Sequence, residues 1–252
     1  MQFELKVISK PKLKDPVLIE GLPGIGNVGK IAADFLVENL KAKRVLEISS
    51  DHFPHSVFIN EKNLVELPTL EIYHKKVNKQ DILFLIGDVQ PIDEPSCYAF
   101  CEAILKYFKS VNGKELVTLG GIGLQKIPKK PKVFITGNNK ALIKSFPKCS
   151  NDIYGFVGPI IGVTGVLLGI ATKYEIPSAS LLTQTFAHPS YLGIKGAKET
   201  LAALNTKYKF ELDLTKLTEE INEIEKEIKS KVQRIAELEG LKTEEKELNY
   251  FG

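Results

Sequence analysis

The sequence lacks several residue types that would point to particular functions. It has no tryptophan and only three cysteines, and just two of its 34 basic residues are arginines. Three cysteines without a C-x-x-C pair exclude a disulfide framework, and we expect Cys97 and Cys101, one helical turn apart, to be buried apolar residues. Arginine is preferred for nucleic-acid recognition, so Arg44 and Arg234 alone argue against a nucleic-acid partner.

The N-terminus also lacks the features of a targeting segment. Residues Met1 to Glu4 have neither the charged head nor the apolar run of a signal peptide. Together with the few cysteines, this predicts a cytoplasmic location. The lysine- and glutamate-rich composition is typical of a hyperthermophile.

Residues 153–172 carry no charge and are just long enough to span a bilayer. Their glycines at 158, 162, 165 and 169 resemble the small-xxx-small pattern of membrane helices. However, Gly155 and the pair Gly158-Pro159 interrupt helical continuity at one end. We therefore expect a loop followed by a fully buried helix whose glycines allow close packing on a sheet, and no membrane contact.

Buried strands alternate with helices along residues 1–210, which predicts an α/β domain. The fold we expect is a mixed, largely parallel sheet flanked by helices. The predicted helices are 28–40, 96–108, 140–146 and a last one beginning over 197–204. The predicted strands are 17–20, 45–48, 57–59, 64–67, 70–73, 81–87, 116–119, 133–136 and 179–183, with 57–59 and 64–67 forming a hairpin and 75–79 a turn.

After residue 210 the pattern changes to one long amphipathic helix, 211–239, followed by a flexible tail, 240–252. Residues 211–252 hold 7 basic and 12 acidic residues, so this part is acidic while the preceding domain is basic. A narrow apolar stripe with heptad spacing in its first half predicts a helical bundle or coiled coil between subunits, with packing on the same chain as the alternative. The stripe is Leu214, Leu217, Ile221, Ile224, Ile228, Val232, Ile235 and Leu238.

Two glycine-rich segments follow predicted strands. Gly24-x-Gly26-x-x-Gly29 has the spacing of a dinucleotide fingerprint, with Glu47 or Asp51 as the acidic residue that such a site needs. The second segment, 120–123, follows another buried strand. Ligands of open α/β sheets bind at the carboxyl ends of strands, so a small-molecule or nucleotide-binding enzyme using 24–29 and 120–123 is the alternative function.

Catalytic and metal-binding patterns are few. His52, His55, His74 and His188 lack metal-site spacing, and no nucleophile motif is present. Asp88, Asp93 and Glu94 follow a central strand, where Pro91 and Pro95 mark a turn, and we interpret them as capping residues. We predict no enzymatic activity, no metal and no cofactor.

The run from Leu18 to Gly29, LIEGLPGIGNVG, resembles the opening signature of the proteasome assembly chaperone family, in the branch of the second chaperone. The resemblance continues through Leu119-Gly120-Gly121, Pro131-Lys132-Val133, residues 158–169 and Ile176-Pro177-Ser178-Ala179, and covers about residues 15–205 in order. It implies a fold similar to the nucleoside phosphorylase architecture, without established catalysis and independent of ATP. It also implies that the glycine motif is structural. At Gln184 many relatives would have an acidic residue.

The resemblance also gives a meaning to Tyr250-Phe251-Gly252. Proteasome activators end in a hydrophobic residue, a tyrosine and any last residue, and here Tyr250 and Phe251 occupy the first two places. The Gly252 carboxylate would pair with a lysine in a pocket between α-ring subunits of the core particle. A homo-oligomer of three to five subunits would add avidity. The function so implied is a proteasome assembly chaperone homologue that assists assembly, opens the gate, or does both.

Overall fold

The computed structural model describes residues 3–153, 158–212, 215 and 218–219. The chain divides into two compact units, Met1–Leu212 and Asp213–Gly252, and nearly all described residues belong to the first. The predicted oligomerisation helix and tail fall almost wholly outside the described residues, and so do all eight residues of the apolar stripe.

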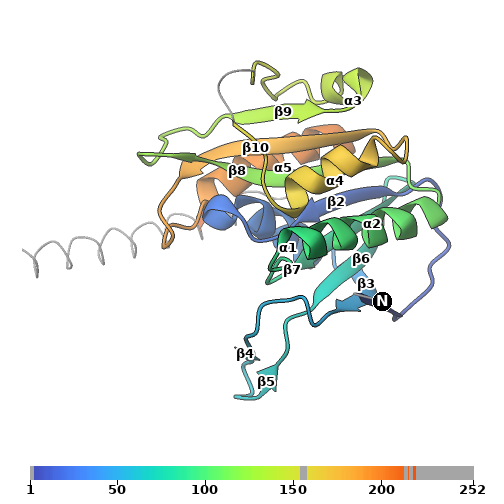
Figure 1. The fold of residues 1–252 in the computed structure, drawn as a ribbon. Helices are drawn as coiled ribbons and strands as arrows, with labels where there is room; N and C mark the ends of the chain where they lie inside the picture. The colour runs from blue at the N-terminus through green and yellow to red at the C-terminus, as the bar shows by residue number, and fades with distance from the viewer. Residues whose placement is uncertain (1–2, 154–157, 213–214, 216–217, 220–252) are drawn as a thin grey trace, which may run out of the picture. The chain divides into compact units, whose positions relative to one another are not determined.

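The first unit is built on one eight-stranded mixed sheet (Figure 1). The four central strands, β7, β2, β8 and β10, run parallel to one another. The strands on both sides of these four are antiparallel to their neighbours. The mixed α/β fold is confirmed, although the parallel part is confined to the centre. In spatial order the strands are β1 (Glu4–Val7), β3 (Lys43–Ser49), β6 (Leu70–Val77), β7 (Gln80–Gly87), β2 (Val17–Gly21), β8 (Glu115–Leu124), β10 (Ser178–Phe186) and β9 (Val133–Gly137).

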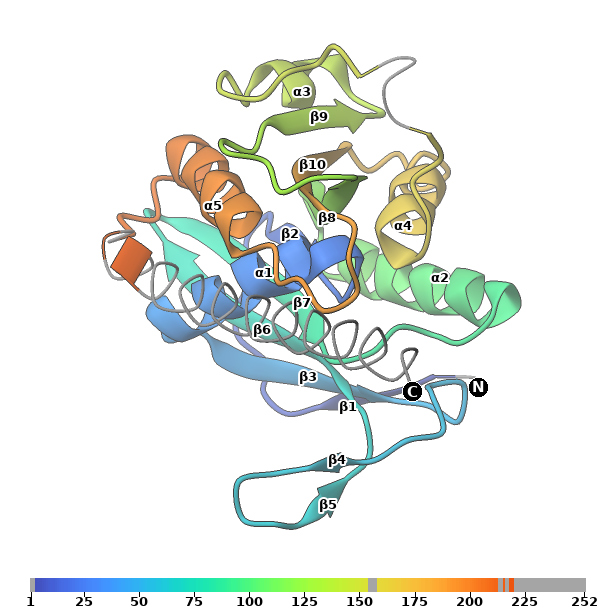
Figure 2. The same cartoon turned by 90° about the vertical axis from the view of Figure 1, so that its left-hand side faces the viewer.

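Helices cover both faces of the sheet, as Figure 2 shows. The helices α1 (Val28–Asn39) and α5 (Ile194–Tyr208) pack together on one face, and α2 (Glu94–Ser110) and α4 (Val163–Ala171) on the other. The short α3 (Lys140–Lys144) lies beside the edge strand β9. Every residue of β2 is buried, as its central position between two helical layers requires.

The start of α2 explains the acidic residues after β7. Asp93 is the N-cap of α2 and accepts a hydrogen bond of 2.7 Å from the Ser96 amide, while the Ser96 side chain accepts one from the Asp93 amide. The hydrogen bond from the Ser96 amide to the carboxylate holds the pKa of Asp93 below its ordinary value. The capping interpretation of Asp93 is therefore confirmed. Cys97 and Cys101 on this helix are buried, as predicted.

Three local features differ from what the sequence predicts. The strand β1 was not predicted; it pairs with β3 at the sheet edge. The predicted turn 75–79 is shorter, because β6 and β7 are joined through Asn78 and Lys79, both with positive φ. The second glycine segment is not a loop after a strand, because residues 120–123 belong to β8 itself.

The described residues 158–172 of the uncharged segment form a loop and a helix, but their glycines do not have the predicted role. A Cβ on Gly165 would lie 2.0 Å from the Ile160 carbonyl oxygen, and one on Gly169 would meet no atom within 4 Å. Gly162 is the N-cap of α4 with φ 78°. The helix is also only partly buried, so side chains such as Leu167, rather than glycines, pack it on the sheet. No helix in the described ranges is long and apolar enough to cross a membrane.

The predicted hairpin is present as a separate two-stranded sheet, β4 (Phe58–Ile59) and β5 (Val65–Glu66). Asn60 organises its turn by accepting hydrogen bonds from the amides of Lys62 and Leu64, each 3.0 Å long. The apolar side chains of this hairpin are largely exposed.

Candidate functional site

The residues predicted to bind the proteasome, Tyr250, Phe251 and Gly252, lie outside the described residues. The described part of the chain does contain the second group of candidates, the two glycine segments. The structure brings these segments together at the carboxyl ends of β2 and β8.

Three glycines of this region, Gly21, Gly29 and Gly121, are required by close backbone packing. A Cβ on Gly21 would lie 2.4 Å from the Gly29 carbonyl oxygen, and one on Gly29 would lie 2.3 Å from that of Leu119. A Cβ on Gly121 would lie 2.1 Å from the Ile25 carbonyl oxygen. The β2–α1 turn and the start of α1 therefore pack directly on β8, which is a structural reason for Gly29 of the motif.

A cavity of about 620 Å³ opens at this edge of the sheet. The chain leaves β2 through α1 towards β3, and it leaves β8 in the opposite direction towards β9 and β10. Ligands of open α/β sheets bind where successive connections diverge in this way, outside the carboxyl ends of the strands. The cavity therefore occupies the position at which this fold class places ligands, and its volume is in the range of small-molecule sites.

The Gln90 side chain connects two segments beside the cavity by hydrogen bonds. Gln90, which follows β7, donates through Nε2 to the Pro23 carbonyl and accepts at Oε1 a 2.9 Å hydrogen bond from the Val163 amide. It thus connects the β2–α1 turn with the start of α4. Neither motif analysis nor hydrophobic periodicity singled out Gln90, since its partners are 67 and 73 residues away.

Beneath the cavity lies a fully buried acid, Glu20 of β2. Its carboxyl group accepts hydrogen bonds from the Leu22 amide (3.0 Å) and the Thr164 hydroxyl (3.3 Å). Burial raises the pKa of Glu20 to about 8, since both hydrogen bonds favour the charged form but do not offset the lost solvation. At neutral pH this side chain is mainly uncharged. The sequence contains a signal for it, because a glutamate inside the apolar run VLIEG predicts a buried acid.

Glu20 begins a row of polar side chains across the sheet. Its register partner on β8 is Thr118, whose partner on β10 is Ser180. The hydroxyl groups of Thr118 and Ser180 are buried and have no hydrogen-bond partner among the described residues. Such groups are uncommon in protein interiors and make this layer less stable than an apolar one.

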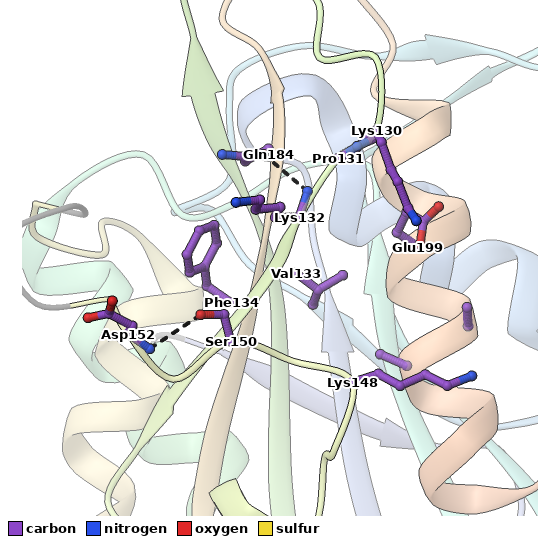
Figure 3. Close-up of a pocket in the computed structure, with 12 residues that line it drawn as sticks. Lys130, Pro131, Lys132, Val133, Phe134, Lys148, Ser150, Asp152, Gln184 and Glu199 are labelled. Atoms are coloured by element: carbon purple, nitrogen blue, oxygen red, sulfur yellow. Dashed lines mark hydrogen bonds between the residues drawn. The ribbon is translucent and has the colours of Figure 1, made fainter.

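A second, larger hollow of about 1050 Å³ lies along the edge strand β9 (Figure 3). Gln184 stands here, and its side-chain oxygen accepts a 3.1 Å hydrogen bond from the Lys132 amide. Its own amide donates to the Lys132 carbonyl. Gln184 therefore extends the pairing of β10 with the segment before β9. The lining contains basic side chains, Lys130, Lys132 and Lys148, and acidic ones, Asp152 and Glu199. Charge alone therefore does not favour an anionic or a cationic ligand in this hollow.

The remaining candidates do not form a site. His74 pairs with Asp81 at 2.8 Å, and the ring of His188 stacks on that of Phe186. Lys30 forms 2.8 Å ion pairs with Asp34 and Asp88. Among the described residues, no three His, Cys, Asp or Glu side chains come close enough together to hold a metal ion.

Comparison with known proteins decides the family. The model of the PAC2 family matches residues 18–232. The chain belongs to the PAC2 family. The PAC2 match spans the LPGIGNVG run, the glycines of β8 and the uncharged segment, and it confirms the resemblance to proteasome assembly chaperones.

The PAC2 relatives include proteins of known structure. PbaB of Pyrococcus furiosus, an archaeal proteasome activator, is 32% identical with a TM-score of 0.83, and the match covers 92% of this chain and 99% of PbaB. PbaA of the same organism, an archaeal homologue of proteasome-assembly chaperone, is 24% identical with a TM-score of 0.77 over the full length of both chains, which supports the fold. The uncharacterized protein MJ1210 of Methanocaldococcus jannaschii is 32% identical over 198 residues, 76% of this chain and 75% of that protein.

Proposed function

We propose that this protein is a homo-oligomeric, non-enzymatic partner of the proteasome that inserts its C-terminal residues into α-ring pockets of the core particle. The observation that carries the proposal is the 32% identity to PbaB, an archaeal proteasome activator, over 99% of that chain. Identity at this level over 92% of this chain supports a shared mode of action as well as a shared fold. Insertion would assist assembly of the core particle, open its gate, or do both.

The sequence of the C-terminus supports the mode of binding. In this proposal Gly252 carries a free carboxylate next to the two aromatic rings of Tyr250 and Phe251. The rings can bury apolar area, and the carboxylate can pair with a lysine in the receiving pocket. A single tripeptide gives weak binding, so several tails on one oligomer would be needed, with an avidity gain on the order of 10²–10⁴.

The apolar stripe from Leu214 to Leu238 would supply the oligomer. Replacing Ile224 and Ile228 by lysine would place charges in the proposed seam, and we expect a smaller particle by light scattering. The control replaces Asn222 and Ser230 by lysine, which adds the same two positive charges outside the stripe and should leave the particle size unchanged.

Binding to purified core particle tests the proposal. Full-length protein should co-elute with the core particle in size-exclusion chromatography. A chain ending at Asn249 should keep its melting temperature and oligomer size but no longer co-elute. If the shortened chain co-elutes to the same extent, the tail is not the binding element.

A further inference from the structure

The cavity at the carboxyl ends of β2 and β8 has an uncharged lining in the described part of the chain. Its walls are aliphatic side chains and glycine backbone, and Thr164 and Gln90 are the polar side chains among the described lining residues. An apolar cavity with few polar groups is typical of small-molecule sites. The aliphatic side chains are Ile25, Ile122, Ile160, Ile161 and Leu182.

Two glycines of the cavity have no packing explanation. Unlike Gly21, Gly29 and Gly121, neither Gly24 nor Gly158 would bring a Cβ within 4 Å of a described atom. Neither has a positive φ that would favour glycine. Both line the cavity, and a Cβ at either position would meet no described atom, so both can be substituted to test the site.

One backbone donor is available at the cavity. In the first turn of α4, the Val163 amide donates to Gln90, and the amides of Gly165 and Val166 both donate to the Gly162 carbonyl. Within the described residues this leaves the Thr164 amide for a ligand. Thr164 lines the cavity, and its first-turn amide points out of the positive end of the helix dipole. An oxygen acceptor is the group that fits this position.

We propose that this cavity binds a small uncharged organic molecule whose carbonyl oxygen accepts a hydrogen bond from the Thr164 amide. The apolar body of the ligand lies against Ile25, Ile122 and Leu182. This site is separate from the C-terminal residues that would engage the proteasome, so either proposal can fail without the other.

The surroundings select an uncharged ligand over an anion. A carboxylate or phosphate would lie among mainly aliphatic side chains and would find no lysine or arginine in the described lining. The carboxyl group of Glu20 also accepts a hydrogen bond from Thr164 and would repel an anion whenever it ionises. A single amide and a helix end do not compensate a full buried charge, whereas they are sufficient for a carbonyl group.

Saturation-transfer difference NMR on the full-length protein at pH 7 tests the site, with benzamide and benzoate as probes of nearly equal shape. Benzamide should give a saturation-transfer signal, and benzoate one at least tenfold weaker. No signal from benzamide, or equal signals from the two probes, would overturn the proposal.

Matched glycine variants place the site. Gly24→Leu and, independently, Gly158→Leu should abolish the benzamide signal by filling the cavity. Gly169→Leu is the control, because Gly169 has the same open surroundings but does not line the cavity. Circular dichroism tests whether each variant is folded. If one of the two cavity variants does not fold, the other is used for the test. A benzamide signal that persists in a folded cavity variant would contradict the assignment.

Discussion

The hydroxyl of Thr164 on α4 donates to a carboxyl oxygen of Glu20 on β2 over 3.3 Å, although the two residues are 144 positions apart. The contact joins a buried, mainly uncharged acid to a residue that lines the cavity. It lies between the central strands and the helix that covers them, so the protonation of Glu20 bears on the stability of the whole sheet.

We expect the protein to lose stability as the pH rises from about 4.5 to about 8. The folded chain keeps the Glu20 proton up to about pH 8, whereas the unfolded chain releases it near the ordinary value of 4.5. The folded state therefore binds more protons in this interval, and the free energy of unfolding falls by on the order of a few kcal/mol. Denaturant titrations at pH 5, 6.5 and 8 measure this slope.

The variant Glu20→Gln isolates this effect, since glutamine does not titrate. Its stability should change less between pH 5 and 8 than that of the natural protein. Glu38→Gln makes the same chemical change at an exposed position and should leave the slope intact. If the free energy of unfolding of Glu20→Gln and of the natural protein changes equally with pH, the raised pKa of Glu20 is not the cause of the pH dependence.

Gln90→Leu should weaken the connection between the β2–α1 turn and α4. The substitution leaves the Val163 amide and the Pro23 carbonyl without their partner, at a cost of about 1–3 kcal/mol. Urea denaturation measures the loss. Gln125→Leu, at an exposed position, is the matched control and should change stability by less than about 0.5 kcal/mol. An equal loss of stability in both variants would contradict the claim that the hydrogen bonds of Gln90 stabilise the fold.

Gly121→Ala tests the packing explanation of the glycine motif. The new Cβ would lie 2.1 Å from the Ile25 carbonyl oxygen, so the β2–α1 turn must move, and we expect a loss of about 1–3 kcal/mol. Gly169→Ala, in an open helical position, should instead gain up to about 1 kcal/mol. If thermal melts show Gly121→Ala to be harmless, close approach is not the reason for this glycine.

Much of the α/β fold could be predicted from short apolar runs such as those of β2 and β7, because a buried central strand needs apolar side chains on both faces. The edge strand β1, with the sequence ELKV, could not, since its pairing with β3 decides its conformation.

The site shows the same division. Periodicity and motif spacing brought Gly24 and Gly120 to notice, and both line the cavity. They could not indicate that Gln90 and Thr164 complete it, because only the folded sheet brings these residues together. The glycine spacing also suggested a nucleotide, whereas the structure accounts for Gly21, Gly29 and Gly121 by backbone packing.

The C-terminal aromatic pair gives a prediction of increased binding. Phe251→Tyr would add the hydroxyl group that proteasome activators carry at this place, and one hydrogen bond contributes about 0.5–1.5 kcal/mol. We expect the half-maximal concentration for core-particle binding to fall roughly two- to tenfold. Phe251→Ala should raise it. Unchanged binding of both variants by surface plasmon resonance would contradict a buried ring at position 251.

The most direct test of proteasome engagement is peptide hydrolysis by purified core particle with full-length protein, with the chain ending at Asn249, or with buffer alone. We predict that the full-length protein stimulates hydrolysis of a fluorogenic peptide and that the shortened chain gives the buffer rate. Equal stimulation by both chains would contradict tail insertion, and the absence of stimulation by the full-length protein would contradict gate opening.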